Sequence, residues 1–223
     1  ILNDVESLPQ GLLFWRSTTH WLGGMGIIVL AIAILPLLGI GGMQLFSAEA
    51  PGISGDKIHP RISDTAKRLW FIYVGYTVAE TLLLSVAGMS LFDAINHAMS
   101  TVSTGGFSTK NDSLTFWNDV PAIQYIVILF MFLGGTNFVL SYFVFKGKIQ
   151  KVLQDEEFKW YATFLGIFLL IVVGVLLSNG SIAQSQQFPQ VWGAYESAFR
   201  HGLFQIVAVV TTTGFVSADF TQW

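Results

Sequence analysis

The chain has 223 residues, of which 52% are hydrophobic and only 11% are charged, and its mean hydropathy is +0.59. A water-soluble domain carries about 25% charged residues, so most of this chain cannot face water. The net charge of −3 and the lack of a basic stripe argue against nucleic-acid binding. The lack of cysteine excludes disulfides and cysteine-ligated metals. Because the first residue is Ile1 and not methionine, we expect a segment of a longer polypeptide.

Apolar runs of two lengths alternate along the chain. A bilayer core of about 30 Å needs roughly 20 apolar residues in a helix, and runs of about 10–14 are more often re-entrant or buried. The long runs cover residues 21–40, 69–89, 122–145 and 160–177. The shorter runs, 91–102 and 195–210, each lead into a Thr/Ser-Gly-Phe string. We interpret them as re-entrant helices, because amphipathic surface helices would carry a polar face rich in Lys and Arg, and Arg200 is the only cation in either run.

Basic residues predict the orientation of the spans. Lysine and arginine gather in cytoplasmic loops, and here they cluster in two linkers, 41–68 and 146–159. These clusters consist of Lys57, Arg61, Lys67 and Arg68, and of Lys146, Lys148, Lys151 and Lys159. Both linkers are therefore expected to be cytoplasmic, with both strings on the outer side.

An internal repeat organises the runs. Superimposing Gly106 on Gly214 aligns the two strings, the short runs before them and the long runs before those. Leu-Gly-Gly also recurs, at residues 22–24 and 133–135. The pattern predicts an all-α polytopic membrane protein of helix–re-entrant pore helix–filter–helix units. Residues 69–145 form one complete unit, 1–40 are the end of a preceding unit with its inner helix, and 160–223 are the outer helix, pore helix and filter of the next.

The two strings have the chemistry of a cation filter. Irregular backbone at membrane depth must be buried in protein or line water. Carbonyl oxygens can replace the hydration shell of potassium, and glycine accepts the positive φ angles that aim successive carbonyls one way. A short helix also directs its negative C-terminal end toward the ion. The candidate filter residues are Ser103, Thr104, Gly105, Gly106 and Phe107 in the first string, and Thr211, Thr212, Thr213, Gly214 and Phe215 in the second.

Other polar and small residues admit two interpretations each. Asp93 and Asn96 in the first short run, and Glu196, Arg200 and His201 in the second, are expected to tether the pore helices to outer helices, with direct ion contact as the alternative. Glu80 lies inside a span, where it is either functional or hydrogen-bonded to a neighbouring helix. Asn137 either faces a cavity or bridges helices.

Paired glycines in the spans are also open to two readings. Gly23, Gly24, Gly134 and Gly135 allow close helix packing, and their repeated context adds the possibility that the packing surrounds a central passage.

The strings, together with the stretch Trp15-Arg16-Ser17-Thr18-Thr19-His20-Trp21-Leu22-Gly23-Gly24-Met25-Gly26, resemble the Trk/Ktr/HKT superfamily of potassium transporters, most closely its bacterial pore subunits. The resemblance covers essentially the whole chain. It implies units arranged pseudo-fourfold around a pore, each giving one filter strand, in a homodimer of a bacterial inner membrane. It further implies a cytoplasmic nucleotide-binding ring of the TrkA type, for which linkers 41–68 and 146–159 are the expected docking surface. Each string lacks the longer Gly-Tyr-Gly ending of potassium channels, so looser selectivity is expected.

Three functional classes are possible for a membrane protein of this kind. Gated potassium permeation through the strings is favoured, because the units run in the same direction. The alternative is an alternating-access transporter that couples potassium to protons or sodium, and such transporters often contain inverted repeats. An enzyme would need a nucleophile or ligand cluster near mid-membrane, which the sequence does not supply. Potassium is then the transported ion, and no cofactor is expected.

Overall fold

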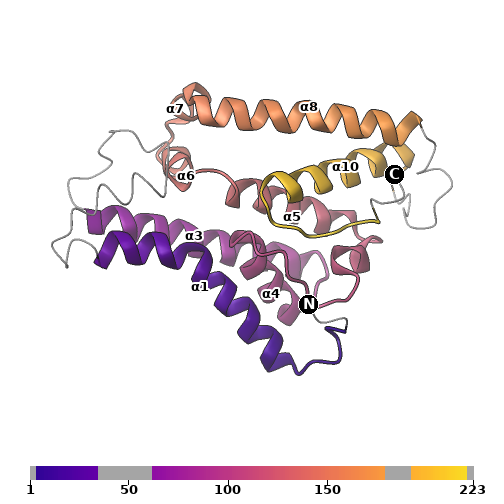
Figure 1. The fold of residues 1–223 in the computed structure, drawn as a ribbon, viewed down its shortest axis with the longest axis horizontal. Helices are drawn as coiled ribbons and strands as arrows, with labels where there is room; N and C mark the ends of the chain where they lie inside the picture. Colours follow the sequence, from indigo (N-terminus) through magenta and orange to yellow (C-terminus); the bar gives the residue numbers. More distant parts are fainter. Residues whose placement is uncertain (1–3, 35–61, 179–191, 220–223) are drawn as a thin grey trace.

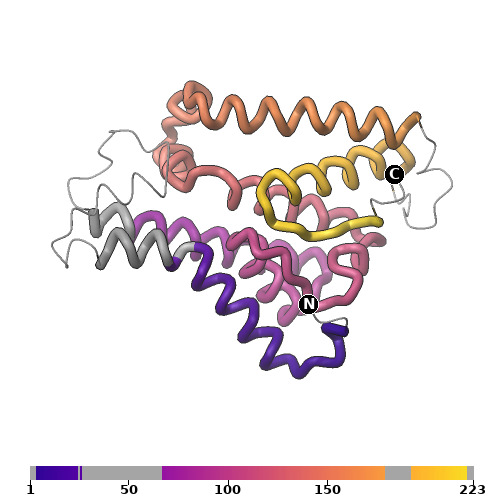
Figure 2. The backbone as a smooth tube through the Cα atoms, in the orientation of Figure 1, coloured from indigo at the N-terminus to yellow at the C-terminus, as the bar shows by residue number. Residues whose placement is uncertain are grey.

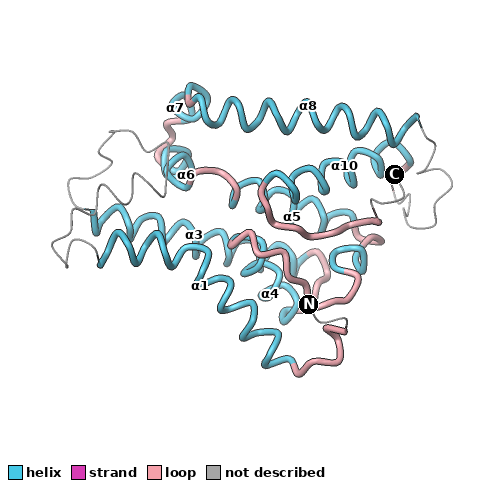
Figure 3. Tube along the Cα trace, in the orientation of Figure 1, coloured by secondary structure: helices cyan, strands magenta, loops and turns pink. Residues whose placement is uncertain are grey.

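The computed structural model describes residues 4–34, 62–178 and 192–219, and every regular element in these ranges is helical (Figures 1 and 3). The elements in chain order are α1 (Gln10–Ile34), α3 (Ile62–Val86), α4 (Leu91–Val102), the 3-10 helix η1 (Ser113–Trp117), α5 (Pro121–Gly134), α6 (Phe138–Phe145), α7 (Ile149–Gln154), α8 (Glu156–Ser178) and α10 (Ala194–Val210).

The long helices agree with the predicted spans. Lys67–Val86 within α3 and Glu156–Ser178, which is α8, are long and apolar enough to cross a membrane. The outward side of α8 consists of large apolar side chains, among them Phe164, Leu170 and Ile171, as expected for a helix in contact with lipid. The first predicted run begins inside α1, and its last residues, 35–40, lie outside the described residues.

The sequence suggested a single helix over residues 122–145, but the structure contains two helices there. These are α5 and α6, which meet at an angle of 106°. Gly135 caps α5 with a hydrogen bond from its N–H to the Met131 carbonyl (2.9 Å). The Asn137 side chain then begins α6 by accepting the Val139 N–H (3.0 Å). A new helix start therefore follows directly after Gly134 and Gly135, because Asn is among the best N-cap residues.

The two short runs form the helices that lead into the strings. The first run coincides with α4, and α10 begins one residue before the second. Ser90 starts α4 by accepting the Asp93 N–H (3.1 Å). Most of α4 is buried, and it packs against α1, α3 and α5; α10 packs against α5 and α8. This enclosure contradicts the alternative of helices lying on a membrane surface.

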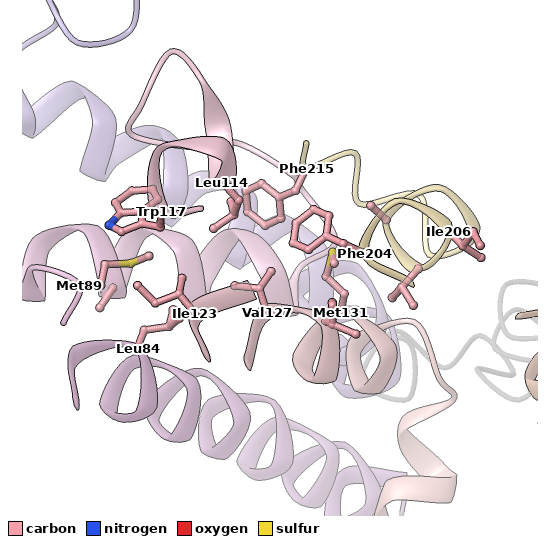
Figure 4. Close-up of a cluster of buried hydrophobic side chains, with 14 of the residues drawn as sticks. Leu84, Met89, Leu114, Trp117, Ile123, Val127, Met131, Phe204, Ile206 and Phe215 are labelled. Atoms are coloured by element: carbon pink, nitrogen blue, oxygen red, sulfur yellow. The ribbon is translucent and has the colours of Figure 1, made fainter. Parts of the chain in front are cut away.

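The helices form two groups, one with α1, α3 and α4 and the other with α8 and α10, and the strings lie between them (Figure 1). Figure 2 shows the segments after α4 and α10 running through the middle of the molecule. One buried apolar cluster joins the groups there and contains Leu114 of η1, Val127 and Met131 of α5, Phe204 of α10 and Phe215 of the second string (Figure 4). The core therefore sits directly beside the strings and fixes their position.

Candidate ion-binding site

Both strings hold a strained backbone at the same positions. Among the described residues, the non-glycine residues with positive φ are Thr104 (53°), Ser113 (54°) and Thr212 (57°). The two threonines occupy equivalent places, and each is followed two residues later by a glycine of positive φ, Gly106 (67°) or Gly214 (82°). A β-branched residue in this region is unusual and costs about 1–3 kcal/mol. Strain that recurs in register must be imposed by the fold around each string.

Each string is tied to the end of its own pore helix by matching hydrogen bonds. Ser103 Oγ donates to the Met99 carbonyl (2.8 Å), and Thr211 Oγ1 donates to the Val207 carbonyl (2.7 Å). The backbone N–H of the following residue repeats this pattern in both strings, with bonds of 2.9 and 3.0 Å to the pore helix. The hydroxyl groups of Ser103 and Thr211 thus donate their hydrogen to the helix. Their oxygen lone pairs stay available as hydrogen-bond acceptors.

The two strings lie side by side. A side chain on Gly106 would collide with the Thr213 carbonyl oxygen of the other string. Just beyond the strings, the Leu114 N–H donates to the Val216 carbonyl (3.0 Å), and the Val216 N–H donates to Ser113 Oγ (3.2 Å). Carbonyl oxygens from both strings are consequently brought into one region. This is the arrangement that a cation needs if several oxygens are to replace its water.

A side-chain latch holds the segment after each string. Thr109 Oγ1 donates to Asp93 Oδ1 (2.6 Å), and His201 Nδ1 is hydrogen-bonded to Ser217 Oγ (3.0 Å). Each latch joins residues 16 apart, from the short helix to the chain beyond the string. Asp93 and His201 occupy the same register of the repeat, although one is an acid and the other an imidazole. The two units therefore hold the segment after the string at the same place, but with different side chains.

A second polar network fixes the pore helix α10. Arg200 is fully buried, and its Nε donates to Glu196 Oε1 (2.8 Å). Glu196 also accepts the Tyr125 hydroxyl proton (3.0 Å), and Arg200 donates to Gln124 Oε1. Tyr125 and Gln124 belong to α5, the inner helix of the preceding unit. The sequence predicted that these residues tether the pore helices to outer helices. The hydrogen bonds of Glu196 and Arg200 lead instead to the inner helix α5. Those of Asp93 and His201 lead to the segments after the strings.

The remaining polar candidates lie on α4, on α3 and at the start of α6. Asn96 Nδ2 donates to the Phe92 carbonyl of its own helix (2.7 Å). Glu80 is fully buried on α3 and faces Thr101 of α4 without a hydrogen bond of normal geometry. A functional role for Glu80 stays a prediction. Asn137 serves as the N-cap of α6.

The second glycine of each Leu-Gly-Gly contacts the next unit. A Cβ on Gly24 would lie 2.7 Å from Ser103 Cβ and 3.0 Å from the Tyr73 hydroxyl. A Cβ on Gly135 would lie 2.5 Å from Thr211 Cγ2 and 3.2 Å from the Tyr161 hydroxyl. Each glycine thus faces the first residue of a string and a tyrosine of the outer helix before it, which is the close approach that small residues permit.

The two tyrosines complete this joint between units. The Tyr73 hydroxyl donates to the Trp21 carbonyl (2.8 Å), and the Tyr161 hydroxyl lies 3.5 Å from the Phe132 carbonyl. The rings also pack, with centroid distances of 5.4 Å for Trp21–Tyr73 and 5.2 Å for Phe132–Tyr161. Each acceptor lies three residues before the second glycine. The joint is therefore repeated as a whole.

Sequence reasoning did not select several of these residues. Thr109 and Ser217 follow their string glycines by three residues, so the alignment of Gly106 on Gly214 could have paired them. Tyr73 and Tyr161 gave a weaker signal, because the outer helices carry no motif that fixes their register.

These elements define a polytopic all-α membrane protein built from a partial set of repeated re-entrant units. The chain belongs to the TrkH family, described as cation transport protein, whose profile matches residues 1–223. Among curated relatives, the Trk system potassium uptake protein TrkH of Escherichia coli K12 is 42% identical over 100% of this chain and 44% of its own length. The Trk system potassium uptake protein TrkG of the same strain is 38% identical, with the same coverage.

A solved structure supports the same assignment. The crystal structure of the potassium transporter TrkH from Vibrio parahaemolyticus superimposes with a TM-score of 0.77 at 36% identity, and the match covers 98% of this chain and 42% of that one. The chain therefore spans less than half the length of the relatives it matches.

Proposed function

We propose that this chain supplies two neighbouring filter strands of a gated, potassium-selective pore for uptake across a bacterial inner membrane. The observation that carries the proposal is the repeated pair of positive φ angles, at Thr104 with Gly106 and at Thr212 with Gly214. A strained conformation that recurs at two unrelated surface loops would be a coincidence. At two pore-helix ends that lie side by side, it has the common purpose of presenting backbone oxygens to one ion.

The filter residues are the ten of the two strings, and the ion is a dehydrated monovalent cation. Potassium is favoured because its hydration shell can be replaced by several neutral carbonyls, and because the curated relatives are named as potassium uptake proteins. Only Gly106 and Gly214 supply the left-handed glycine of each strand. This short ordered segment gives fewer binding positions than a longer filter, so the discrimination against sodium should be modest.

The rest of the pore lies beyond these strands. Residues 69–145 are the complete unit, flanked by the end of one unit and the beginning of another, so the pseudo-fourfold ring requires further units of the same design. The implied assembly is a homodimer with a TrkA-like nucleotide-binding regulatory subunit at linkers 41–68 and 146–159. In Figure 1, α6 and α7 lie at the same end of the molecule as the end of α1 and the start of α3. The described part of the first linker, residues 62–68, and the second linker therefore lie at one end of the molecule (Figure 1).

Substituting the string glycines tests the filter assignment. Gly106→Ser and Gly214→Ser force a side chain into left-handed backbone, and at Gly106 also into the Thr213 carbonyl. Rubidium uptake by the full-length protein, in cells without other potassium uptake systems, should then become more sensitive to sodium. Gly75→Ser on α3, whose Cβ position has no described atom within 4 Å apart from the backbone of its own helix, is the control. Unchanged discrimination in both string variants would remove the filter assignment.

Electrical recording tests the transport mechanism separately. Purified full-length protein in planar bilayers should show unitary potassium currents, because the strings of all units together would line one continuous pathway. Strict alternating access moves few ions per conformational cycle and would give no resolvable unitary current. That outcome would favour the coupled transporter while leaving the strings as the binding site.

A further inference from the structure

The outer end of the first string is contacted by a polar pair from the preceding unit. Arg16 and His20 are one helical turn apart on α1, on the side that packs against α4. Arg16 Nη2 donates to the Ser108 carbonyl (2.5 Å), one residue beyond the string. Its guanidinium also lies over the Phe107 ring, 5.1 Å from the centroid. One side chain thus restrains both the backbone and the aromatic ring at this end of the filter.

His20 contacts the same string one turn further along. Its ring lies 4.6 Å from that of Phe107, and a Cβ on Gly105 would come within 2.7 Å of His20 Nδ1. The imidazole therefore fills the space beside Gly105, directly before the left-handed Gly106. Together the two side chains flank the string from its middle to its outer end.

The second string shows what the fold itself requires at these positions. Aligning the two Leu-Gly-Gly motifs places Arg16 opposite Val127 and His20 opposite Met131. Val127 and Met131 are fully buried and belong to the same apolar cluster as Phe215 (Figure 4). Phe215 is fully buried, whereas Phe107 is 43% exposed. Apolar side chains are therefore sufficient to seat a string of this design, so the fold does not demand an arginine and a histidine.

A cation beside a cation pathway is costly unless it has a specific task, because like charges repel. We propose that Arg16 and His20 are positioning residues of the first filter strand, and that they set its share of the discrimination between potassium and sodium. The guanidinium fixes the Ser108 carbonyl and the Phe107 ring, and the imidazole limits movement at Gly105. The inference rests on the proposed filter function and makes the two strands chemically unequal.

Sodium competition against rubidium uptake by the full-length protein tests this role. Arg16→Met removes the donor and the charge, and a lost charge-assisted hydrogen bond of this kind should lower discrimination about three- to tenfold, at a similar maximal rate per molecule. Arg16→Lys keeps a donor but cannot lie flat over Phe107, so it should retain part of the discrimination. His20→Phe keeps the ring contact with Phe107 but changes the group beside Gly105. It should therefore also lower the discrimination between potassium and sodium. Met131→Leu, at the equivalent place in the other unit, is the matched control.

The outcomes separate this inference from the filter assignment. If Gly106→Ser alters discrimination while Arg16→Met and His20→Phe do not, the positioning role is wrong and the filter stands. If none of the three alters it, the first string takes no part in discrimination and the positioning role is wrong. If Gly214→Ser also leaves it unchanged, the filter assignment itself is wrong. A merely structural role for Arg16 and His20 would lower the unfolding temperature and the amount in the membrane without changing discrimination. Should Arg16→Met fail to reach the membrane, Arg16→Lys and His20→Phe decide the question by the same measurement.

Discussion

Adjacent glycines in one motif should respond to alanine with opposite signs. Gly23 and Gly24 are consecutive residues of α1. Apart from the backbone of its own helix, a Cβ on Gly23 meets no described atom within 4 Å, whereas a Cβ on Gly24 would lie 2.7 Å from Ser103 Cβ and 2.9 Å from Ser103 Cα. The second of these contacts is with backbone, which cannot rotate away. Ser103 must therefore move, and with it the start of the first string.

The magnitudes follow from the two surroundings. Alanine is favoured over glycine inside a helix by roughly 0.5–1 kcal/mol, so Gly23→Ala should leave stability unchanged or raise it. Gly24→Ala gains the same helix term but forces a methyl group into a filled space, which typically costs about 1–3 kcal/mol. The two variants should thus differ by about 1–3 kcal/mol in the free energy of unfolding, since the helix term is common to both.

Thermal unfolding of the purified full-length protein measures the order, and rubidium uptake measures its consequence. We expect the unfolding temperature of Gly24→Ala to fall below that of the parent and of Gly23→Ala. Because the displaced residue opens the first string, Gly24→Ala should also weaken discrimination against sodium. Equal unfolding temperatures for the two variants, or a larger loss for Gly23→Ala, would refute the packing of α1 against the string.

Three further predictions concern charged and polar contacts. Glu196→Ala leaves the buried Arg200 without its carboxylate partner and should destabilise the protein by about 3–5 kcal/mol. In chemical unfolding, the double variant with Arg200→Met should be more stable than Glu196→Ala alone. Strictly additive effects of the two substitutions would argue against the ion pair. Thr109→Val removes a hydrogen bond to a carboxylate and should cost about 1.5 kcal/mol, measured in the same way, with no loss if the latch is unimportant. The pKa of Asp4 lies below its ordinary value of 3.8, chiefly because the Asn111 amide donates to its carboxylate, so this contact stabilises the folded N-terminal segment above that pH and is lost as the pH falls through the lowered pKa. Asn111→Ala should raise the pKa of Asp4 toward 3.8, and hydrogen exchange at residues 4–8 that is insensitive to this substitution would contradict the contact.

The lengths of the apolar runs were enough to predict the long helices α3 and α8 and both short helices that precede the strings. Residues 91–102 were expected as a short helix and form α4 with the same bounds, because a length of 12 residues and a Ser-x-x-Asp start are properties of the local chain. The break between α5 and α6 was not predicted. Leu-Gly-Gly at residues 22–24 stays helical and the same motif at 133–135 ends a helix, and the difference lies in the Asn137 cap that follows the second copy.

The sequence by itself determined the class of this protein: hydrophobic runs of two lengths, basic linkers and paired glycine strings define repeated re-entrant membrane units, because each of these signals resides in a short stretch of chain. Only the tertiary structure decided which unit supports which string. Gly24 faces Ser103 and Arg16 binds the Ser108 carbonyl across the boundary between units. Such contacts depend on how separate helices pack, and residues nearly a hundred positions apart carry no local signal that they will meet.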